Sequence, residues 1–195
     1  MSTGTFVLAM FAFSVFWIFP CIGICVFLHE LGHACTSIFL GCKVKKFRIG
    51  TGTKWARGFT LRVNGERVKV YFSPDFASGS VSPEKPASPS VAAAIILAGP
   101  VVNLLLAGIG ASILWLTLED PIVVRKICRS FGDGYACHPL IESNIRAALI
   151  IIVTGIFALV NAAVVMIALI PTEGSDGHLL LKIARGKFHE LAVWK

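Results

Sequence analysis

The sequence predicts an all-α, multi-pass membrane protein with a core of three transmembrane helices and a small β-hairpin inserted between the first two. Of its 195 residues, 55% are apolar and only 15% are charged, whereas ordinary globular domains are about 25% charged. Residues 1–28, 91–118 and 147–170 contain no charged side chain. Each stretch exceeds the roughly 20 apolar residues that cross a bilayer. Between the first two stretches, Asn64-Gly65 separates two alternating runs, which is a strong hairpin signal.

The first apolar stretch does not resemble a cleaved signal peptide. It has no basic residue at its start, and its apolar character continues to Leu40. We therefore expect one membrane element at about residues 5–40. Pro20 is expected to kink this element or to break it into two pieces. Gly41 is a typical residue at which a helix ends.

The segment 41–90 is expected to hold the β-structure. Residues 44–50 alternate in part, and residues 58–72 read as two strand arms around the Asn64-Gly65 turn. Residues 73–90 are rich in serine and proline, so we expect a loop there.

The rest of the chain continues the membrane pattern. Spans are predicted at 91–118 and 147–170, with a loop at 119–146 between them. The tail 176–195 shows a helical apolar pattern that Gly186 interrupts, and it is too charged to span. We expect this tail to lie along the inner face of the membrane. The whole chain, 1–195, is predicted to be a single domain.

The distribution of basic residues predicts the orientation. Segment 41–90 carries ten Lys and Arg against three acidic residues, whereas segment 119–146 carries four of each. Basic loops stay in the cytoplasm, so 41–90 and the tail should be cytoplasmic and the amino terminus outside. The net charge of +7 follows from this topology, which argues against a nucleic-acid partner. We expect a multi-pass protein of the prokaryotic cytoplasmic membrane.

Two of the six cysteines share the predicted outer loop. Cys128 and Cys137 could form a disulfide if that loop faces an oxidising space. The alternatives are two unpaired thiols, or a second metal site that also uses His138. The other four cysteines lie in or beside the first span and are expected to pack as small apolar groups.

Residues 29–33 read His-Glu-Leu-Gly-His, an HExxH motif at the end of the first charge-free stretch. On a helix, His29 and His33 lie on one face and can bind one Zn²⁺. Glu30 can then act as a general base on water. Three ionisable residues in a membrane helix are costly and indicate a functional site. The structural alternative is a polar seam between helices.

Two histidines do not complete a catalytic zinc site, which usually has three protein ligands. Asp176, just after the third span, can supply the third ligand if that span packs beside the first. Asp is equally suited to be a helix N-cap, so from spacing alone both roles stay open. Glu173 and His178 are lesser candidates.

Three stretches together resemble the site-2 protease family of intramembrane zinc metalloproteases. They are LHELGHACTSIFLGCKVKKFRIGTG at 28–52, ILAGPVVNLLLAG at 96–108 and LIPTEGSDGHLLLKIARGK at 169–187. The likeness covers nearly the whole chain and corresponds to a minimal core without a peptide-binding PDZ or nucleotide-sensing CBS domain. Glu173, Gly174 and Ala168 depart from the Asn- and Pro-rich turn that family members often carry before Asp-Gly.

The resemblance implies the roles of the site residues. It makes Asp176 the third zinc ligand beside His29 and His33, and Glu30 the catalytic base. It also places Asn103 near the active site, to hold the substrate backbone or the developing oxyanion. From the residues alone, Asn103 reads as a polar anchor between helices.

The expected function is a zinc endopeptidase that cuts the transmembrane segments of single-span membrane proteins. We expect the hairpin at 58–72, with the strand at 44–50, to pair with the unwound substrate as an added strand. The main rival is an inactive membrane scaffold that keeps a metal site. A protease with a Glu ligand would need Glu142 or Glu173, and a metal transporter would need polar residues in several spans. The sequence specifies no oligomeric state.

Overall fold

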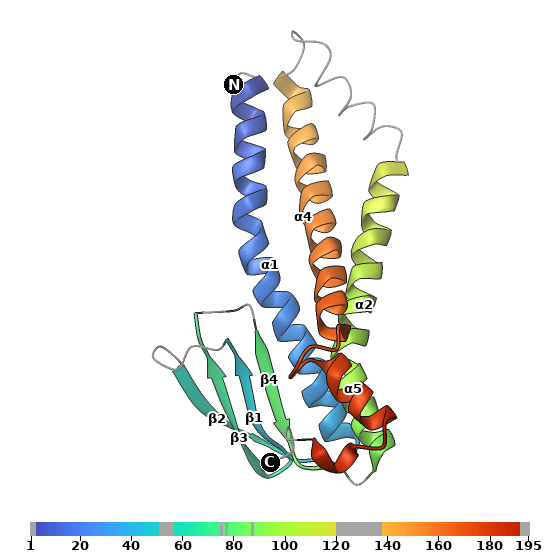
Figure 1. The fold of residues 1–195 in the computed structure, drawn as a ribbon. Coiled ribbons are helices and arrows are strands. Elements are labelled where there is room, and N and C mark those ends of the chain that lie inside the picture. Colours follow the sequence, from blue (N-terminus) through green and yellow to red (C-terminus); the bar gives the residue numbers. More distant parts are fainter. Residues whose placement is uncertain are drawn as a thin grey trace. The chain divides into compact units, whose positions relative to one another are not determined.

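The computed structural model describes residues 3–50, 57–74, 76, 78–86, 88–119 and 138–191. Helices and strands follow one another in the chain as shown in Figure 1. The helices are α1 (Thr3–Phe39), α2 (Pro89–Glu119), α4 (His138–Leu169), α5 (Asp176–Ala184) and the short 3-10 helix η1 (Phe188–Glu190). The strands are β1 (Val44–Ile49), β2 (Arg57–Val63), β3 (Glu66–Phe72) and β4 (Gly79–Pro83).

The chain forms two compact units. One comprises Met1–Cys21 and Leu106–Asn161, and the other comprises Ile22–Leu105 and Ala162–Lys195. The described residues of the first unit are helical. Among them Asn161 is fully buried and donates from Nδ2 to the carbonyl of Phe157 at 2.8 Å. The second unit contains the sheet, α5 and the predicted site residues His29, Glu30, His33, Asn103 and Asp176.

Three helices are long and apolar enough to cross a membrane, as predicted. These segments are Leu8–Phe39, Pro89–Leu118 and Ala148–Leu169, with mean hydropathies of 2.4, 2.2 and 2.7. Helix α1 is continuous through Pro20, so of the two expected outcomes, a kink or a break, the break does not occur. Helix α4 starts at His138, well before residue 147, because a helix can continue beyond the apolar stretch that crosses the bilayer.

The β-structure is a four-stranded sheet in the order β2-β3-β1-β4. Strands β2 and β3 are antiparallel, β1 and β3 are parallel, and β4 is antiparallel to β1. The sequence prediction missed β4, which lies inside the expected loop at 73–90. Its residues, Gly-Ser-Val-Ser-Pro, have little intrinsic strand preference. They adopt the strand because β1 offers a full row of hydrogen-bonding partners.

The turn between β2 and β3 follows the chemistry of its residues. Asn64 and Gly65 have φ angles of 51° and 83°, as in a type I′ hairpin turn, in which both central residues have positive φ. The turn sets the register, with Val63 opposite Glu66 and Leu61 opposite Val68.

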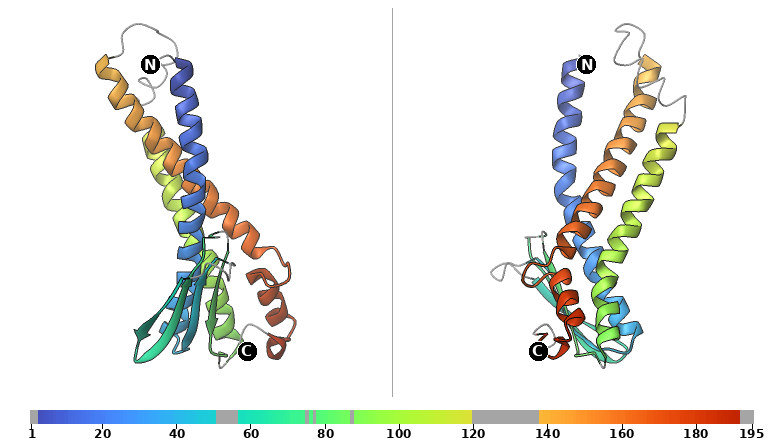
Figure 2. Two further views of the ribbon diagram at one scale, coloured as in Figure 1. Left: turned by 90° about the vertical axis from the view of Figure 1, so that its left-hand side faces the viewer. Right: turned by 45° about the vertical axis from the view of Figure 1, so that its right-hand side comes forward.

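One face of the sheet packs on the carboxyl-terminal part of α1. Buried Val26 and Ala34 of α1 share a core with Phe47 and Ile49 of β1 and with other strand residues. The ring of Phe27 lies 5.8 Å from the ring of Phe47, edge to face. Figure 2 (left) shows the sheet in front of this part of α1. The alternation of apolar residues along β1 and β3 therefore serves to cover one helix.

Helix α5 anchors the carboxyl-terminal segment. Its Leu179, together with Phe188 and Leu191, packs on Ala92 and Ile96 of α2. The helix ends at Ala184, two residues before Gly186, whose φ is 74°. The predicted interruption at Gly186 is confirmed, and the helical part of the tail is short.

Candidate functional site

Helix α1 presents the residues of the HExxH motif to the interior of the second unit. His29, Glu30 and His33 are 7%, 8% and 8% exposed. Because His29 and His33 are four residues apart, they share one face of the helix, and their ring centroids lie 4.8 Å apart. Burying three ionisable groups is costly unless they act on a ligand or on one another.

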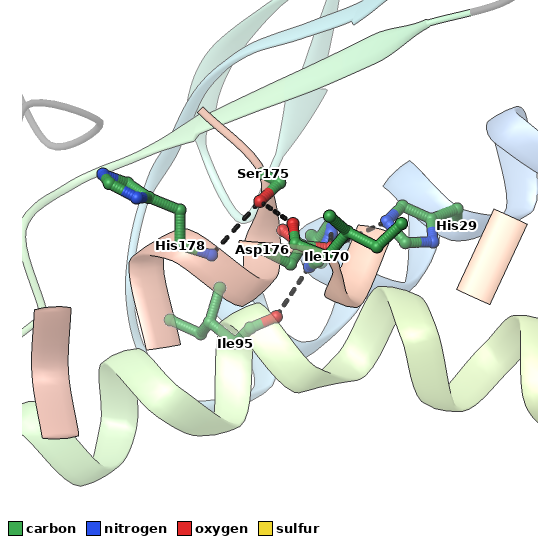
Figure 3. Close-up of polar contacts among 7 residues, drawn as sticks. His29, Ile95, Ile170, Ser175, Asp176 and His178 are labelled. Carbon is green, nitrogen blue, oxygen red and sulfur yellow. Dashed lines mark hydrogen bonds and ion pairs between the residues drawn. The ribbon is translucent and has the colours of Figure 1, made fainter. Parts of the chain in front are cut away.

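Asp176 comes to these histidines from the start of α5 (Figure 3). Its Oδ2 lies 3.0 Å from Nε2 of His29 and 3.4 Å from Nε2 of His33. One ligand atom from each of the three residues lies within 4.8 Å of the other two. Two imidazole nitrogens and one carboxylate oxygen are the donor set of a catalytic zinc site with an open fourth position.

The alternative role for Asp176, a helix N-cap, is filled by its neighbour. Ser175 is the N-cap of α5, and its hydroxyl accepts a hydrogen bond from the backbone N–H of His178 at 3.1 Å. The carboxylate of Asp176 is therefore directed to the histidines instead.

Helix α2 determines which ring nitrogen of neutral His33 carries the proton. Nδ1 of His33 lies 2.7 Å from the carbonyl oxygen of Ile95, which can only accept, so Nδ1 carries a proton. In the neutral ring Nε2 then has a lone pair, and it faces Oδ2 of Asp176. The lone pairs of these two atoms repel each other unless a proton or a metal cation lies between them. Metal-binding histidines commonly have this outer hydrogen bond to a carbonyl.

The charge state of Asp176 suits the same role. Burial raises its pKa, but the hydrogen bonds and positive charge of His29 and His33 outweigh burial and lower the pKa below its ordinary value. The carboxylate is therefore ionised at neutral pH, as a metal ligand must be.

Gly99 of α2 keeps open the space in front of both ligand nitrogens. A Cβ added there would lie 2.7 Å from Nε2 of His29 and would also collide with Nε2 of His33. Helices α1 and α2 are in close contact at the same level, where a Cβ added at Gly32 would lie 2.9 Å from the carbonyl oxygen of Ala98. Helix α2 is continuous through Pro100, the residue after Gly99.

Asn103 lies one helical turn beyond Gly99 and so on the same face of α2. It is fully buried, and neither its Nδ2 nor its Oδ1 has a hydrogen-bond partner among the described residues. Buried amides are normally paired. This unpaired amide can therefore receive a group that enters the site.

Strand β4 forms one wall of the pocket beside these residues. The pocket is lined by Glu30, His33, Asp176, Gly174, Ile95, Ile96, Leu179 and four residues of β4, namely Gly79, Ser80, Val81 and Pro83. A Cβ at Gly79 would lie 2.7 Å from Oε1 of Glu30. Strand β4 is also an edge of the sheet. No sequence pattern indicated this wall, because β4 itself was not predicted.

The other predicted candidates stand apart from the metal-binding group. His178 and Glu173 are not among the three clustered ligands, and Glu173 is exposed. Strands β1 and β3 each have neighbours on both sides, so of the expected hairpin and strand only β2 lies at an edge of the sheet, and it does not line the pocket. Cys128 and Cys137 lie outside the described residues, as do the side chains of His138 and Glu142.

The chain is similar to one family of known proteins. Residues 17–192 match the family model described as peptidase family M50. No curated protein matches the chain.

Proposed function

The chain belongs to peptidase family M50, whose members are membrane metalloproteases, and from this premise we propose that it is a zinc endopeptidase that cuts peptide bonds within membrane-spanning segments. The observation that carries the proposal is the convergence of His29, His33 and Asp176 on one point. The family match supports the site-2 protease resemblance seen in the sequence.

Nε2 of His29, Nε2 of His33 and a carboxylate oxygen of Asp176 would hold the zinc ion. The lone pair of His33, fixed by its bond to Ile95, and the space kept by Gly99 fit such an ion. When bound, zinc supplies a Lewis acid that polarises the scissile carbonyl and makes water more acidic.

Glu30 acts as the general base. It follows the first ligand in the helix, and its carboxylate borders the pocket beside β4. From there it takes a proton from the attacking water and delivers it to the leaving nitrogen. The close contact with Gly79 restricts the positions open to this carboxylate, which orients it for the transfer.

Asn103 stabilises the negative charge that develops on the scissile oxygen, or holds the substrate backbone. Its buried Nδ2 has no partner among the described residues, so the donor is available without first breaking another bond. A fixed donor of this kind stabilises the transition state more than the ground state.

The substrate binds as an extra strand on β4. The peptide must be extended for its carbonyl to be reached, and an edge strand satisfies the exposed backbone groups of such a peptide. Strand β4 has a free edge and lines the pocket. This replaces the expectation that the hairpin at 58–72 and the strand at 44–50 receive the substrate.

The substrates are single-span membrane proteins, and cleavage near the cytoplasmic face releases a cytoplasmic fragment. The excess of basic residues in 41–90 supports a cytoplasmic position for the sheet and the site, with the amino terminus outside. The alternative is an inactive scaffold with a metal site. Such a scaffold would not require the carboxylate of Glu30 to lie beside Gly79 in the pocket.

The test is zinc content measured beside cleavage in purified wild type and three variants. Single-span model substrates are offered in detergent. We expect Glu30→Gln to keep zinc and lose cleavage, Asp176→Ala to lose both, and Glu173→Gln, an exposed carboxylate nearby, to keep both. Zinc in the wild type with no effect of Glu30→Gln on cleavage would contradict the proposed role of Glu30. Absence of zinc from the wild type would contradict the metal site itself.

A further inference from the structure

The face of the sheet that points away from α1 is strongly basic. Successive side chains of a strand point to opposite faces, and the apolar set packs on α1. The register of the strands gives the opposite set, which carries no acidic residue. Its basic members, called here the basic face, are Lys46, Arg48, Arg62, Arg67 and Lys69. Its other members are Gly58, Thr60, Tyr71, Ser80 and Ser82.

The basic side chains are direct neighbours across the strands. Lys46 is the partner of Lys69, and Arg62 is the partner of Arg67. Like charges directly opposite each other destabilise a sheet. Two such pairs, with no acidic residue on the same face, are stabilised when an anion from outside the chain lies over them.

Two of these cations already gather around one aromatic ring. The ammonium of Lys46 lies 5.4 Å from the ring centroid of Tyr71, and the guanidinium carbon of Arg48 lies 5.8 Å from it. Nε of Arg48 is buried and has no hydrogen-bond partner among the described residues. A phosphate oxygen is the acceptor that suits a guanidinium best.

The sheet lies beside the carboxyl-terminal part of a helix that is long and apolar enough to cross a membrane. Strand β1 begins at Val44, five residues after α1 ends at Phe39, and β4 ends at Pro83, six residues before α2 begins at Pro89. Val44 and Pro83 are register partners, so one end of the β1–β4 pair is joined to the carboxyl-terminal end of α1 and to the amino-terminal end of α2. The first ionisable side chain of α1 is His29, and the sheet packs on α1 around this level.

The outer strand also exposes apolar side chains on its other face. Phe59 and Leu61 of β2 are 52% and 47% exposed, and they point to the side of the sheet on which α1 lies. Phe76, 48% exposed, lies against Gly23 of α1. An element with one apolar and one basic side is typical of the interface between headgroups and acyl chains. An acidic soluble protein bound to the basic face would leave these apolar side chains exposed to water.

We propose that the basic face binds the anionic headgroups of the bilayer in which the helices lie. Clusters of four to eight basic residues next to a membrane helix act in this way. Contact with lipid phosphate neutralises the facing cations and fixes the sheet at the membrane surface. This proposal does not depend on the protein being an active protease.

The test uses the full chain reconstituted in phosphatidylcholine bilayers with spin-labelled lipids. The fraction of motionally restricted spin label reports how strongly the protein selects phosphatidylglycerol over phosphatidylcholine. We expect the wild type to prefer phosphatidylglycerol about fivefold, the effect of one basic residue at an anionic surface. This preference should fall as salt is added, because exposed charges are screened.

A variant of the basic face and a variant with the same net charge decide the cause. Arg62→Gln, Arg67→Gln and Lys69→Gln, combined, should bring the preference close to one. Lys182→Gln, Arg185→Gln and Lys187→Gln, combined, remove the same charge from the carboxyl-terminal segment and should lower the preference much less. The proposal is overturned if the wild type shows no preference, if the face variant keeps it, or if both variants lose it equally. Thermal unfolding serves as the check that each variant is folded.

Discussion

Replacing Gly99 by alanine tests whether the metal lies where the ligands converge. The added methyl group would enter the space in front of two ligand nitrogens and touch no other part of the proposed chemistry. Alanine favours helix over glycine by up to about 1 kcal/mol, so the helix itself should tolerate the change. The expected result is loss of zinc in a protein that remains folded.

The size of the effect follows from the distances. An ordinary contact of a Cβ is at least 3.4 Å, and the contact with Nε2 of His29 would be 2.7 Å, so the ring must retreat by the difference, about 0.7 Å. Metal–ligand distances tolerate about ±0.2 Å. Loss of an outer hydrogen bond alone typically lowers metal affinity 10- to 100-fold. Displacing two direct ligands should therefore lower zinc affinity at least about 100-fold, or roughly 3 kcal/mol.

The assay is competition for zinc against a fluorescent chelator, with the protein in detergent. Gly108→Ala is the matched control, since it lies in the same helix and nothing lies within 4 Å of an added Cβ. It should bind zinc like the wild type. Equal affinity in the two variants and the wild type would show that the metal does not occupy the space beside Gly99, and the reasoning would fail.

Three further substitutions separate the functions of neighbouring residues. Asn103→Leu removes an amide whose two polar atoms are buried and unpaired among the described residues. Thermal unfolding should therefore show equal or higher stability, while the rate of cleavage falls by a factor of about 100 or more. A less stable, fully active variant would contradict the proposed role. Gly79→Ala would push the flexible carboxylate of Glu30 aside, so assays should find zinc retained and cleavage lost; unchanged cleavage would argue against that contact. The methyl group of Gly177→Ala would collide with the backbone of Leu169, which cannot move easily, so the free energy of unfolding should fall by about 1–3 kcal/mol. Unchanged stability in thermal unfolding would contradict this position of α5.

The sequence predicted the elements whose signals are local. Three charge-free stretches predicted three spans, and Asn64-Gly65 predicted the turn of the hairpin, because each signal is contained in adjacent residues. Strand β4 was missed because its strand conformation is determined by pairing with β1. The start of α4 at His138 was missed because hydropathy marks the membrane, and a helix need not end where the membrane does.

The site could be predicted as far as its residue types allowed. His29 and His33 follow from helical spacing alone. The convergence of Asp176 depends on the fold, and from spacing its role was balanced against an N-cap that Ser175 provides. Gly99 contributes by lacking a side chain, and Ile95 contributes through its backbone carbonyl. The spacing of residue types in the sequence does not reveal either contribution.

The close contact of α1 and α2 determines the route by which a substrate reaches the zinc ligands. At Gly32 the helices are so near that an added Cβ would lie 2.9 Å from the carbonyl of Ala98, and the bond from His33 to Ile95 joins them again one turn away. An extended peptide needs about 4.7–4.9 Å to each neighbouring backbone, so no peptide can pass through this seam without breaking the ligand's hydrogen bond. For the proposed protease, we therefore expect substrate to enter from the side of β4 and α5, where the pocket lies. A covalent crosslink between α1 and α2 at this level should then leave turnover intact.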